Sequence, residues 1–202
     1  MKKLAVVIMA LAMLCMAEGL FAQEHQKSSW YIGFGLGTGD GSWEFEGEET
    51  TFNEWLEGLS TSPIFTLNFG VGMIINPKLH LGFDFSAIRQ EGDGVINGDD
   101  VEGNIQINNY LVALTYFPNS EGFFLKGGAG TSSIMNEVSS GSTSTSESYY
   151  GTALLGGVGY AFWLAKSFNL CLNAEYSHQF YSNINAPDNS HFWNLYVSCY
   201  WF

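Results

Sequence analysis

Apolar and polar side chains alternate with a period of two along most of the chain from residue 29 onward. In residues 29–39, for example, Trp30, Ile32, Phe34 and Leu36 alternate with small residues, chiefly glycine. Such alternation places successive side chains on opposite faces of a β-strand. The pattern predicts eight strands, over residues 29–39, 64–75, 78–90, 105–117, 123–133, 149–162, 167–180 and 192–202.

The connections between these strands are long and short in turn. Long connections cover residues 40–61, 91–104, 134–148 and 181–191, and short ones cover residues 76–77, 118–122 and 164–166. A soluble sandwich or lipocalin-like barrel shows the same period, but it has no reason to place every long loop at one end. Tight turns at one end and long extracellular loops at the other are typical of outer-membrane barrels. The sequence therefore predicts an all-β fold: one eight-stranded antiparallel up-and-down transmembrane β-barrel.

Charge follows the same asymmetry. The formal net charge is −13, 16% of the residues are aromatic and only 13% are charged. Because Lys and Arg do not cluster, the composition excludes nucleic acid as a partner. The acidic residues of the first two long loops are Asp40, Glu44, Glu46, Glu48, Glu49, Glu54, Glu57, Glu91, Asp93, Asp99, Asp100 and Glu102, whereas Lys27, Lys78 and Lys166 belong to the opposite end.

Aromatic residues at the strand ends predict a girdle at each membrane interface. They are Trp30, Tyr31, Phe117, Phe123, Tyr149, Tyr150, Phe162, Trp163 and Phe180.

Residues 1–22 have the pattern of a secretory signal peptide. Lys2 and Lys3 precede an apolar run, and that run of roughly 13 residues is shorter than the ~20 that a membrane-spanning helix needs. Cys15 raises the alternative of a lipoprotein signal, but Leu14 stands where a small residue is expected. The expected organisation is a signal peptide over residues 1–22 and a single barrel domain over residues 23–202.

Three segments carry a resemblance to a known family: the glycine-alternating strand that starts at Tyr31, the run Phe124–Gly130, and the ending Tyr200-Trp201-Phe202. With them the chain resembles small outer-membrane β-barrel proteins of the OmpA/OmpX type. The resemblance implies an outer-membrane location in a Gram-negative-type bacterium, surrounded by outer-membrane lipid and lipopolysaccharide. It also implies that Phe202, with Tyr200, is the signal read by the barrel-assembly machinery.

Several charged residues fall on the predicted inner face of the barrel. An eight-stranded barrel is just wide enough for side chains to fill it, and charges buried there need partners. We therefore predict a luminal polar network that plugs the barrel, with Lys126 between carboxylates. The alternative is a path for protons or solutes. The network residues are His80, Asp84, Lys126 and Glu175, together with Arg89.

The orientation of the last strand also decides whether Cys171 and Cys199 can form a disulfide. If Phe202, Tyr200 and Tyr196 face lipid, then Cys199 points inward, and a cross-strand disulfide with Cys171 becomes a hypothesis. Shifting the strand by one residue turns Cys199 outward and removes the disulfide. The terminal aromatic motif favours the first arrangement, which predicts an aromatic interior wall.

The sequence contains only weak matches to phosphate-binding, metal-binding and catalytic motifs. The glycines from Gly33 to Gly39 lie inside a strand, not in a phosphate-binding loop before a helix. Residues 93–100 are acidic without the spacing of a calcium loop, so no metal or other cofactor is predicted. The segment Phe180–Asn183 resembles the His-x-Ser-Asn motif of lipid A deacylases, but Phe180 replaces the histidine. Without that base Ser182 is not activated, and no enzymatic activity is expected.

The predicted function is therefore structural or surface-interactive, through an unknown extracellular partner that binds the four long loops. A narrow channel or transporter for small or apolar solutes is the alternative, and a lipid A-modifying enzyme is the third hypothesis.

Overall fold

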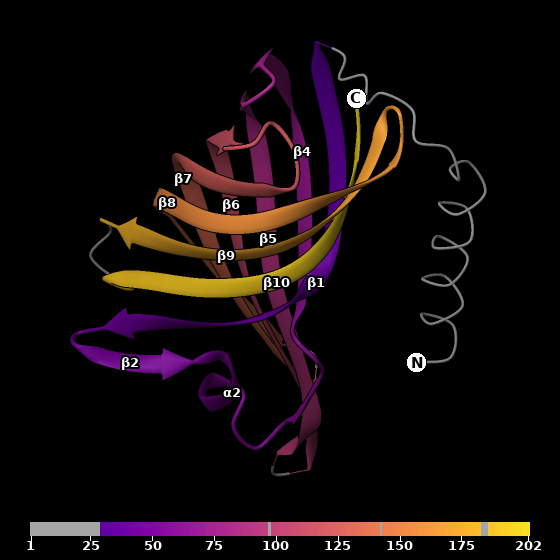
Figure 1. The fold of residues 1–202 in the computed structure, drawn as a ribbon. Helices are drawn as coiled ribbons and strands as arrows, with labels where there is room; N and C mark the ends of the chain where they lie inside the picture. The colour runs from indigo at the N-terminus through magenta and orange to yellow at the C-terminus, as the bar shows by residue number, and fades with distance from the viewer. Residues whose placement is uncertain (1–28, 97, 142, 183–185) are drawn as a thin grey trace.

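A computed structural model describes residues 29–96, 98–141, 143–182 and 186–202. Within them, eight long antiparallel strands form a closed ring, because β1 pairs with both β4 and β10 (Figure 1). This confirms the predicted barrel. The signal peptide predicted for residues 1–22 lies outside the described residues. The strands of the ring are β1 (Trp30–Phe45), β4 (Phe65–Asn76), β5 (Leu79–Ile96), β6 (Asp99–Tyr116), β7 (Phe123–Ser140), β8 (Thr143–Ala165), β9 (Phe168–Tyr181) and β10 (Asn189–Trp201).

Short turns join β4 to β5, β6 to β7 and β8 to β9 at one end of the barrel, which we call the inner end. The opposite end is the outer end. Two of the long loops predicted there, residues 91–104 and 134–148, are wrong as loops: the β5–β6 and β7–β8 ladders continue through them. The alternation continues into these segments with Val101, Ile105 and Ile134 facing inward, and Gly98 and Gly141 provide the positive φ of the turns.

The first long connection has structure of its own. After β1 it contains β2 (Glu48–Thr51), α2 (Phe52–Trp55) and β3 (Ser60–Thr61). β2 pairs with β1, and β3 pairs with β5 near Asp93. The connection therefore lies between β1 and β5 at the outer end, where β4 is too short to reach.

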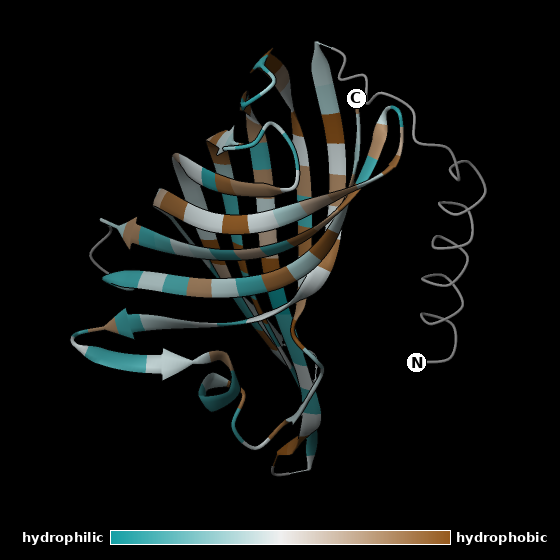
Figure 2. Cartoon of the chain, in the orientation of Figure 1, coloured by the Kyte–Doolittle hydropathy of each residue, from teal (hydrophilic) through white to brown (hydrophobic). Residues whose placement is uncertain are grey.

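Hydrophobic residues alternate with polar or small ones along the strands of the ring (Figure 2), and the large apolar side chains are on the outward face. Large side chains that a soluble protein would bury are about half exposed there, among them Phe34, Leu36, Val112, Leu154 and Leu195. A continuous apolar outer band is what the hydrocarbon core of a membrane requires of a barrel. No helix among the described residues is long and apolar enough to cross a membrane.

The predicted facing of the last strand is wrong. Trp193, Leu195 and Val197 are exposed on the outer wall, and Asn194 and Tyr196 are buried inside. Two interior features favour this arrangement. The Tyr196 hydroxyl donates a hydrogen bond to Glu175, and the missing side chain of Gly35 leaves room for the tyrosine ring, since a Cβ there would lie 2.6 Å from Tyr196 Cδ2. The inner face of β10 therefore carries Asn194, Tyr196, Ser198 and Tyr200 in place of the predicted Trp193, Leu195, Val197, Cys199 and Trp201.

The same facing excludes the proposed disulfide. Cys171 is paired in register with Ser198, and Cys199 with Leu170. Neighbouring residues of one strand point to opposite faces, so Cys171 lies on the inner face and Cys199 on the outer. Cys171 and Cys199 form no disulfide in the described part of the chain.

Side chains inside the barrel are arranged in layers. Aromatic rings occupy the inner end, charged and amide groups follow, and an apolar cluster fills the outer end. The outer cluster includes Trp43, Phe52, Ile88, Ile105, Ile107, Ile134, Tyr181, Ala186 and Phe192.

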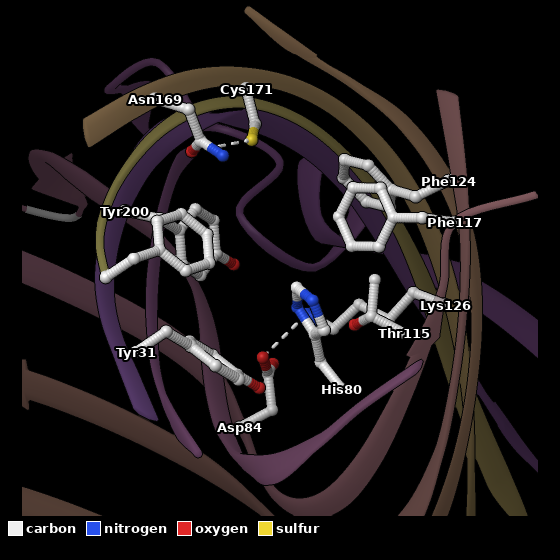
Figure 3. Close-up of a pocket in the computed structure, with 11 residues that line it drawn as sticks. Tyr31, His80, Asp84, Thr115, Phe117, Phe124, Lys126, Asn169, Cys171 and Tyr200 are labelled. Atoms are coloured by element: carbon white, nitrogen blue, oxygen red, sulfur yellow. Dashed lines mark hydrogen bonds and ion pairs between the residues drawn. The ribbon is translucent and has the colours of Figure 1, made fainter. Parts of the chain in front are cut away.

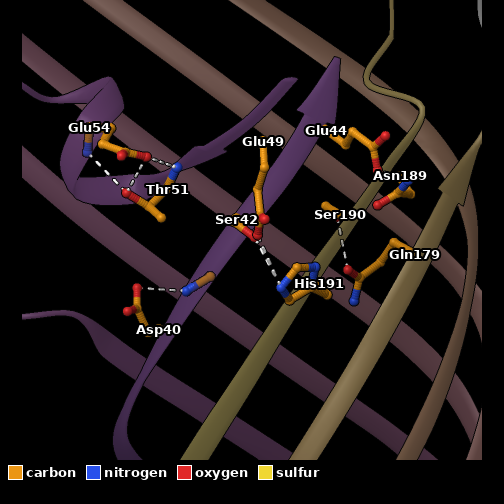
Figure 4. Close-up of polar contacts among 11 residues, drawn as sticks. Asp40, Ser42, Glu44, Glu49, Thr51, Glu54, Gln179, Asn189, Ser190 and His191 are labelled. Atoms are coloured by element: carbon orange, nitrogen blue, oxygen red, sulfur yellow. Dashed lines mark hydrogen bonds and ion pairs between the residues drawn. The ribbon is translucent and has the colours of Figure 1, made fainter. Parts of the chain in front are cut away.

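α2 brings Phe52 into this outer cluster, where its side chain is fully buried. The turn is held by a capping box (Figure 4). The Glu54 carboxylate accepts hydrogen bonds of 2.8 Å from both the backbone N–H and the hydroxyl of Thr51, and the Glu54 N–H donates to that hydroxyl. A local motif at the surface therefore positions a buried aromatic ring.

Acidification should loosen this turn. The backbone and hydroxyl donors of Thr51 lower the pKa of Glu54 below its ordinary value of 4.5. Because the folded-state pKa is lowered, the contribution of the cap is complete above pH 4.5 and is lost as the pH falls through the lowered value. We expect the NMR signals of the Glu54 and Leu56 amides to shift over that acidic range. The Glu54→Gln variant should show no such transition; an unchanged transition would mean that another group is responsible.

Candidate functional site: the luminal charge cluster and the outer end

The central group of the lumen is the amine of Lys126. It lies 2.6 Å from Asp84 Oδ2 and 2.9 Å from Glu175 Oε1, and all three side chains are at least nine-tenths buried. The three residues come from β7, β5 and β9. The sequence predicted them as a cluster from their inward positions alone, and the structure brings them into direct contact.

Gly157 makes the contact between Lys126 and Glu175 sterically feasible. On β8 it is paired in register with Lys126 on one side and with Glu175 on the other. A Cβ at Gly157 would lie 2.6 Å from Glu175 Cγ. Because no side chain stands between β7 and β9 at this level, the ion pair spans the intervening strand.

The other two predicted members of the network differ: His80 lies in the lumen beside the cluster, and Arg89 lies outside it. His80 is buried closer to the inner end, against the rings of Tyr31 and Phe117 at centroid distances of 5.7 and 4.8 Å. The prediction that Arg89 faces inward is wrong, because its side chain is half exposed and forms an ion pair with Glu91. The reason is parity, since Asp84, Ser86 and Ile88 on β5 face inward and the next residue must face out.

Sequence reasoning missed several aromatic members of the site. Tyr196 and Tyr200 were expected in lipid, and Tyr31 and Phe117 were expected in the girdles. All four point into the lumen, where Tyr196 is hydrogen bonded to Glu175. The available signal was the glycine-rich inner face of β1: a Cβ at Gly33 would clash with the ring of Tyr200.

Towards the outer end, amide and hydroxyl side chains form the next layer. Gln179 donates to Asn109 Oδ1 at 3.3 Å and accepts from Ser190 at 2.8 Å. The Ser190 and Tyr181 hydroxyls are 2.9 Å apart. This chain of contacts links the polar lumen to the apolar outer cluster.

At the outer end the first and last long connections touch each other (Figure 4). Asn189 donates to the Glu44 carboxylate at 2.9 Å, and the Asp188 N–H donates to the Glu44 carbonyl at 2.8 Å. On the outer wall Ser42 donates to Glu49 and lies 3.0 Å from His191 Nε2. Residues 188–191 of the predicted partner-binding loop 181–191 therefore contact residues 42–44 of loop 40–61.

The elements of the lipid A deacylase motif are not assembled. Phe180, which stands at the histidine position of the motif, is exposed on the outer wall. Asn183 lies outside the described residues. Ser182 is exposed, and no hydrogen bond joins it to a histidine in the described part of the chain. Within the same part, no three His, Cys, Asp or Glu side chains are arranged to hold a metal ion.

The first of two similar solved structures shares this fold. Ail of Yersinia pestis, whose structure was solved in complex with the heparin analogue sucrose octasulfate, is 16% identical, with a TM-score of 0.59 and coverage of 86% of this chain and 100% of Ail. Neisserial surface protein A is 16% identical, with a TM-score of 0.47 and coverage of 86% and 97%. No curated protein matches the sequence.

A family model settles the relationship. The model described as the outer membrane protein beta-barrel domain matches residues 6–200. Together with the closed ring of strands and its apolar outer band, this places the protein in the outer membrane of a Gram-negative bacterium. The chain belongs to the outer membrane protein β-barrel domain family.

Proposed function

We propose that this barrel is a surface-interaction protein: its lumen is closed by side chains, and its acidic outer end binds a cationic partner outside the cell. The observation that carries the proposal is the packing of the first connection at the outer end, where Phe52 and Leu56 are buried. A connection packed over the mouth of the barrel would leave the outer end as a surface for binding and not as an entrance.

The close packing of the first connection against the β5–β6 hairpin supports the proposal. On the β5–β6 hairpin, Gly92 and Gly103 lie under Leu56 and Leu59, and a Cβ at Gly103 would lie 2.7 Å from Leu56 Cδ2. Because these glycines have no side chains, the first connection can approach the β5–β6 hairpin closely. This close contact favours a connection that packs on the hairpin over one that extends into solvent.

The negative charge of the outer end supports a cationic partner. The long connections and hairpins at the outer end carry acidic residues almost throughout, and Arg89 is their only Lys or Arg. Such a surface attracts cations and repels polyanions. A sulfated ligand like the sucrose octasulfate bound to Ail is therefore not the class of partner we propose here.

The test combines conductance with binding. We expect the barrel to show no stepwise current in planar bilayers. In neutral-lipid nanodiscs it should bind polylysine, and the variant Glu46→Gln/Glu48→Gln, which removes two exposed outer-end charges, should bind several-fold more weakly at low salt. The difference should vanish at high salt.

Glu121→Gln is the control, since Glu121 lies in the inner-end β6–β7 connection. If this control weakens polylysine binding as much as the outer-end variant does, the acidic platform is not the binding surface.

A narrow channel is the second candidate, and one observation favours it. Buried polar atoms in the middle of the lumen, on Asn68, Ser86 and Asn194, have no protein partner. Buried polar groups of this kind are normally satisfied by ordered water. Stepwise currents that persist with the outer cover intact would support the channel and contradict a closed lumen.

A further inference from the structure

A partly enclosed cavity lies in the lumen beside the charge cluster, and Asp84 and Lys126 are among the side chains that line it (Figure 3). Two aromatic pairs form opposite walls: Tyr31 with Tyr200, at a centroid distance of 5.7 Å, and Phe117 with Phe124, at 5.1 Å. The free space is about 20 Å³. That volume admits one or two particles the size of a water molecule.

One carboxylate oxygen in the cavity is not satisfied. Asp84 Oδ2 pairs with Lys126, but Asp84 Oδ1 is buried without a hydrogen-bond partner. Asp84 as a whole is only 5% exposed, and Figure 3 shows its carboxylate directed toward the middle of the cavity. An ionised oxygen held in such a site is costly unless a cation or a donor meets it.

The charges of the cluster do not balance. Lys126 supplies one positive charge, whereas Asp84 and Glu175 together supply two negative charges. The remaining titratable side chains that line the cavity are His80, Tyr31, Tyr200 and Cys171. With the tyrosines, the cysteine and the imidazole of His80 all neutral, the site has a deficit of one positive charge.

We propose that this cavity binds one small monovalent cation with a weak hydration shell, of which ammonium is the best fit, between Asp84 Oδ1 and the aromatic walls. Aromatic faces attract cations that give up their water readily. Ca²⁺ and Mg²⁺ take six or more oxygen ligands, and the cavity provides few. The inference is independent of the function proposed for the outer end.

The test uses the folded barrel in detergent micelles, with the aromatic NMR signals of Tyr31 and Tyr200 followed during titration with ammonium chloride. We expect a saturable shift with ammonium. Tetramethylammonium chloride, which is too large for the cavity, should reproduce only the effect of ionic strength. Asp84→Asn should weaken ammonium binding at least about tenfold, because it removes the charged ligand.

Glu91→Gln is the matched control, since it removes one negative charge on the exposed β5 extension and should leave ammonium binding unchanged. Heat-modifiable gel migration verifies that each variant is folded. If Asp84→Asn does not fold, Phe124→Leu replaces it; loss of one aromatic wall should weaken binding several-fold.

Three results would overturn the proposal. The first is an equal response to ammonium and tetramethylammonium, and the second is wild-type affinity in the folded Asp84→Asn or Phe124→Leu variant. The third is the absence of any saturable response between pH 6 and 9, which would mean that a proton already supplies the missing positive charge.

Discussion

Replacing Lys126 with methionine should lower the free energy of unfolding by about 3–5 kcal/mol, because it leaves two buried carboxylates without their cation. Urea unfolding of the barrel in lipid vesicles, followed by tryptophan fluorescence, measures the change. The loss arises from the uncompensated charges and not from the lost packing of the lysine stem, since methionine is similar in length.

A compensated variant separates these causes. Lys126→Met combined with Asp84→Asn and Glu175→Gln removes every charge of the cluster and should recover most of the lost stability. Lys166→Met, at the inner-end turn between β8 and β9, should change stability by less than about 0.5 kcal/mol. If the compensated variant is as unstable as Lys126→Met alone, charge imbalance is not the cause.

Replacing Phe52 with alanine should release the cover of the outer end. Phe52 is fully buried and packs on Trp43 at a centroid distance of 5.9 Å. Truncating a buried phenylalanine costs about 3–5 kcal/mol. The capping box alone cannot hold the connection, because exposed caps contribute about 0.5–2 kcal/mol. We expect proteases to cleave residues 46–61 at least about tenfold faster, with the barrel ladder intact.

Phe45→Ala is the matched control for that experiment. Phe45 belongs to the same outer-end region, but its side chain is 43% exposed, so its removal should leave protease resistance nearly unchanged. Should Phe52→Ala stay as resistant as the wild type, the connection is anchored by contacts other than its buried ring. Bilayer recordings on the same variant show whether removing the cover alone permits a current.

Much of the architecture could be predicted from local patterns. In each strand of a barrel, inward-facing and outward-facing residues alternate along the sequence of that strand alone. The number of strands, their order and the end that carries the short turns could therefore be predicted without knowing any contact. The inward positions of Asp84, Lys126 and Glu175 followed from the same alternation. The strand ends were less predictable, because the β5–β6 and β7–β8 ladders extend into mostly polar and acidic segments, where only a few apolar residues such as Val101 and Ile134 continue the alternation.

The last strand shows what alternation cannot decide. Both of its faces contain aromatic residues, so hydropathy fits either orientation, and a terminal motif suggested the wrong one. The space that Gly35 leaves for Tyr196, and the carboxylate of Glu175 that accepts its hydroxyl, decide the orientation. These partners lie on β1 and β9, and only the closed ring brings them beside β10.

By itself, then, the sequence determined the barrel, the apolar outer band and the acidic outer end, because these depend on the order of residue types along single strands. The tertiary structure alone decided which carboxylates hold Lys126, which rings enclose the cavity beneath it and how α2 covers the outer cluster. Those features depend on distances between residues far apart in the chain, and closure of the ring sets those distances.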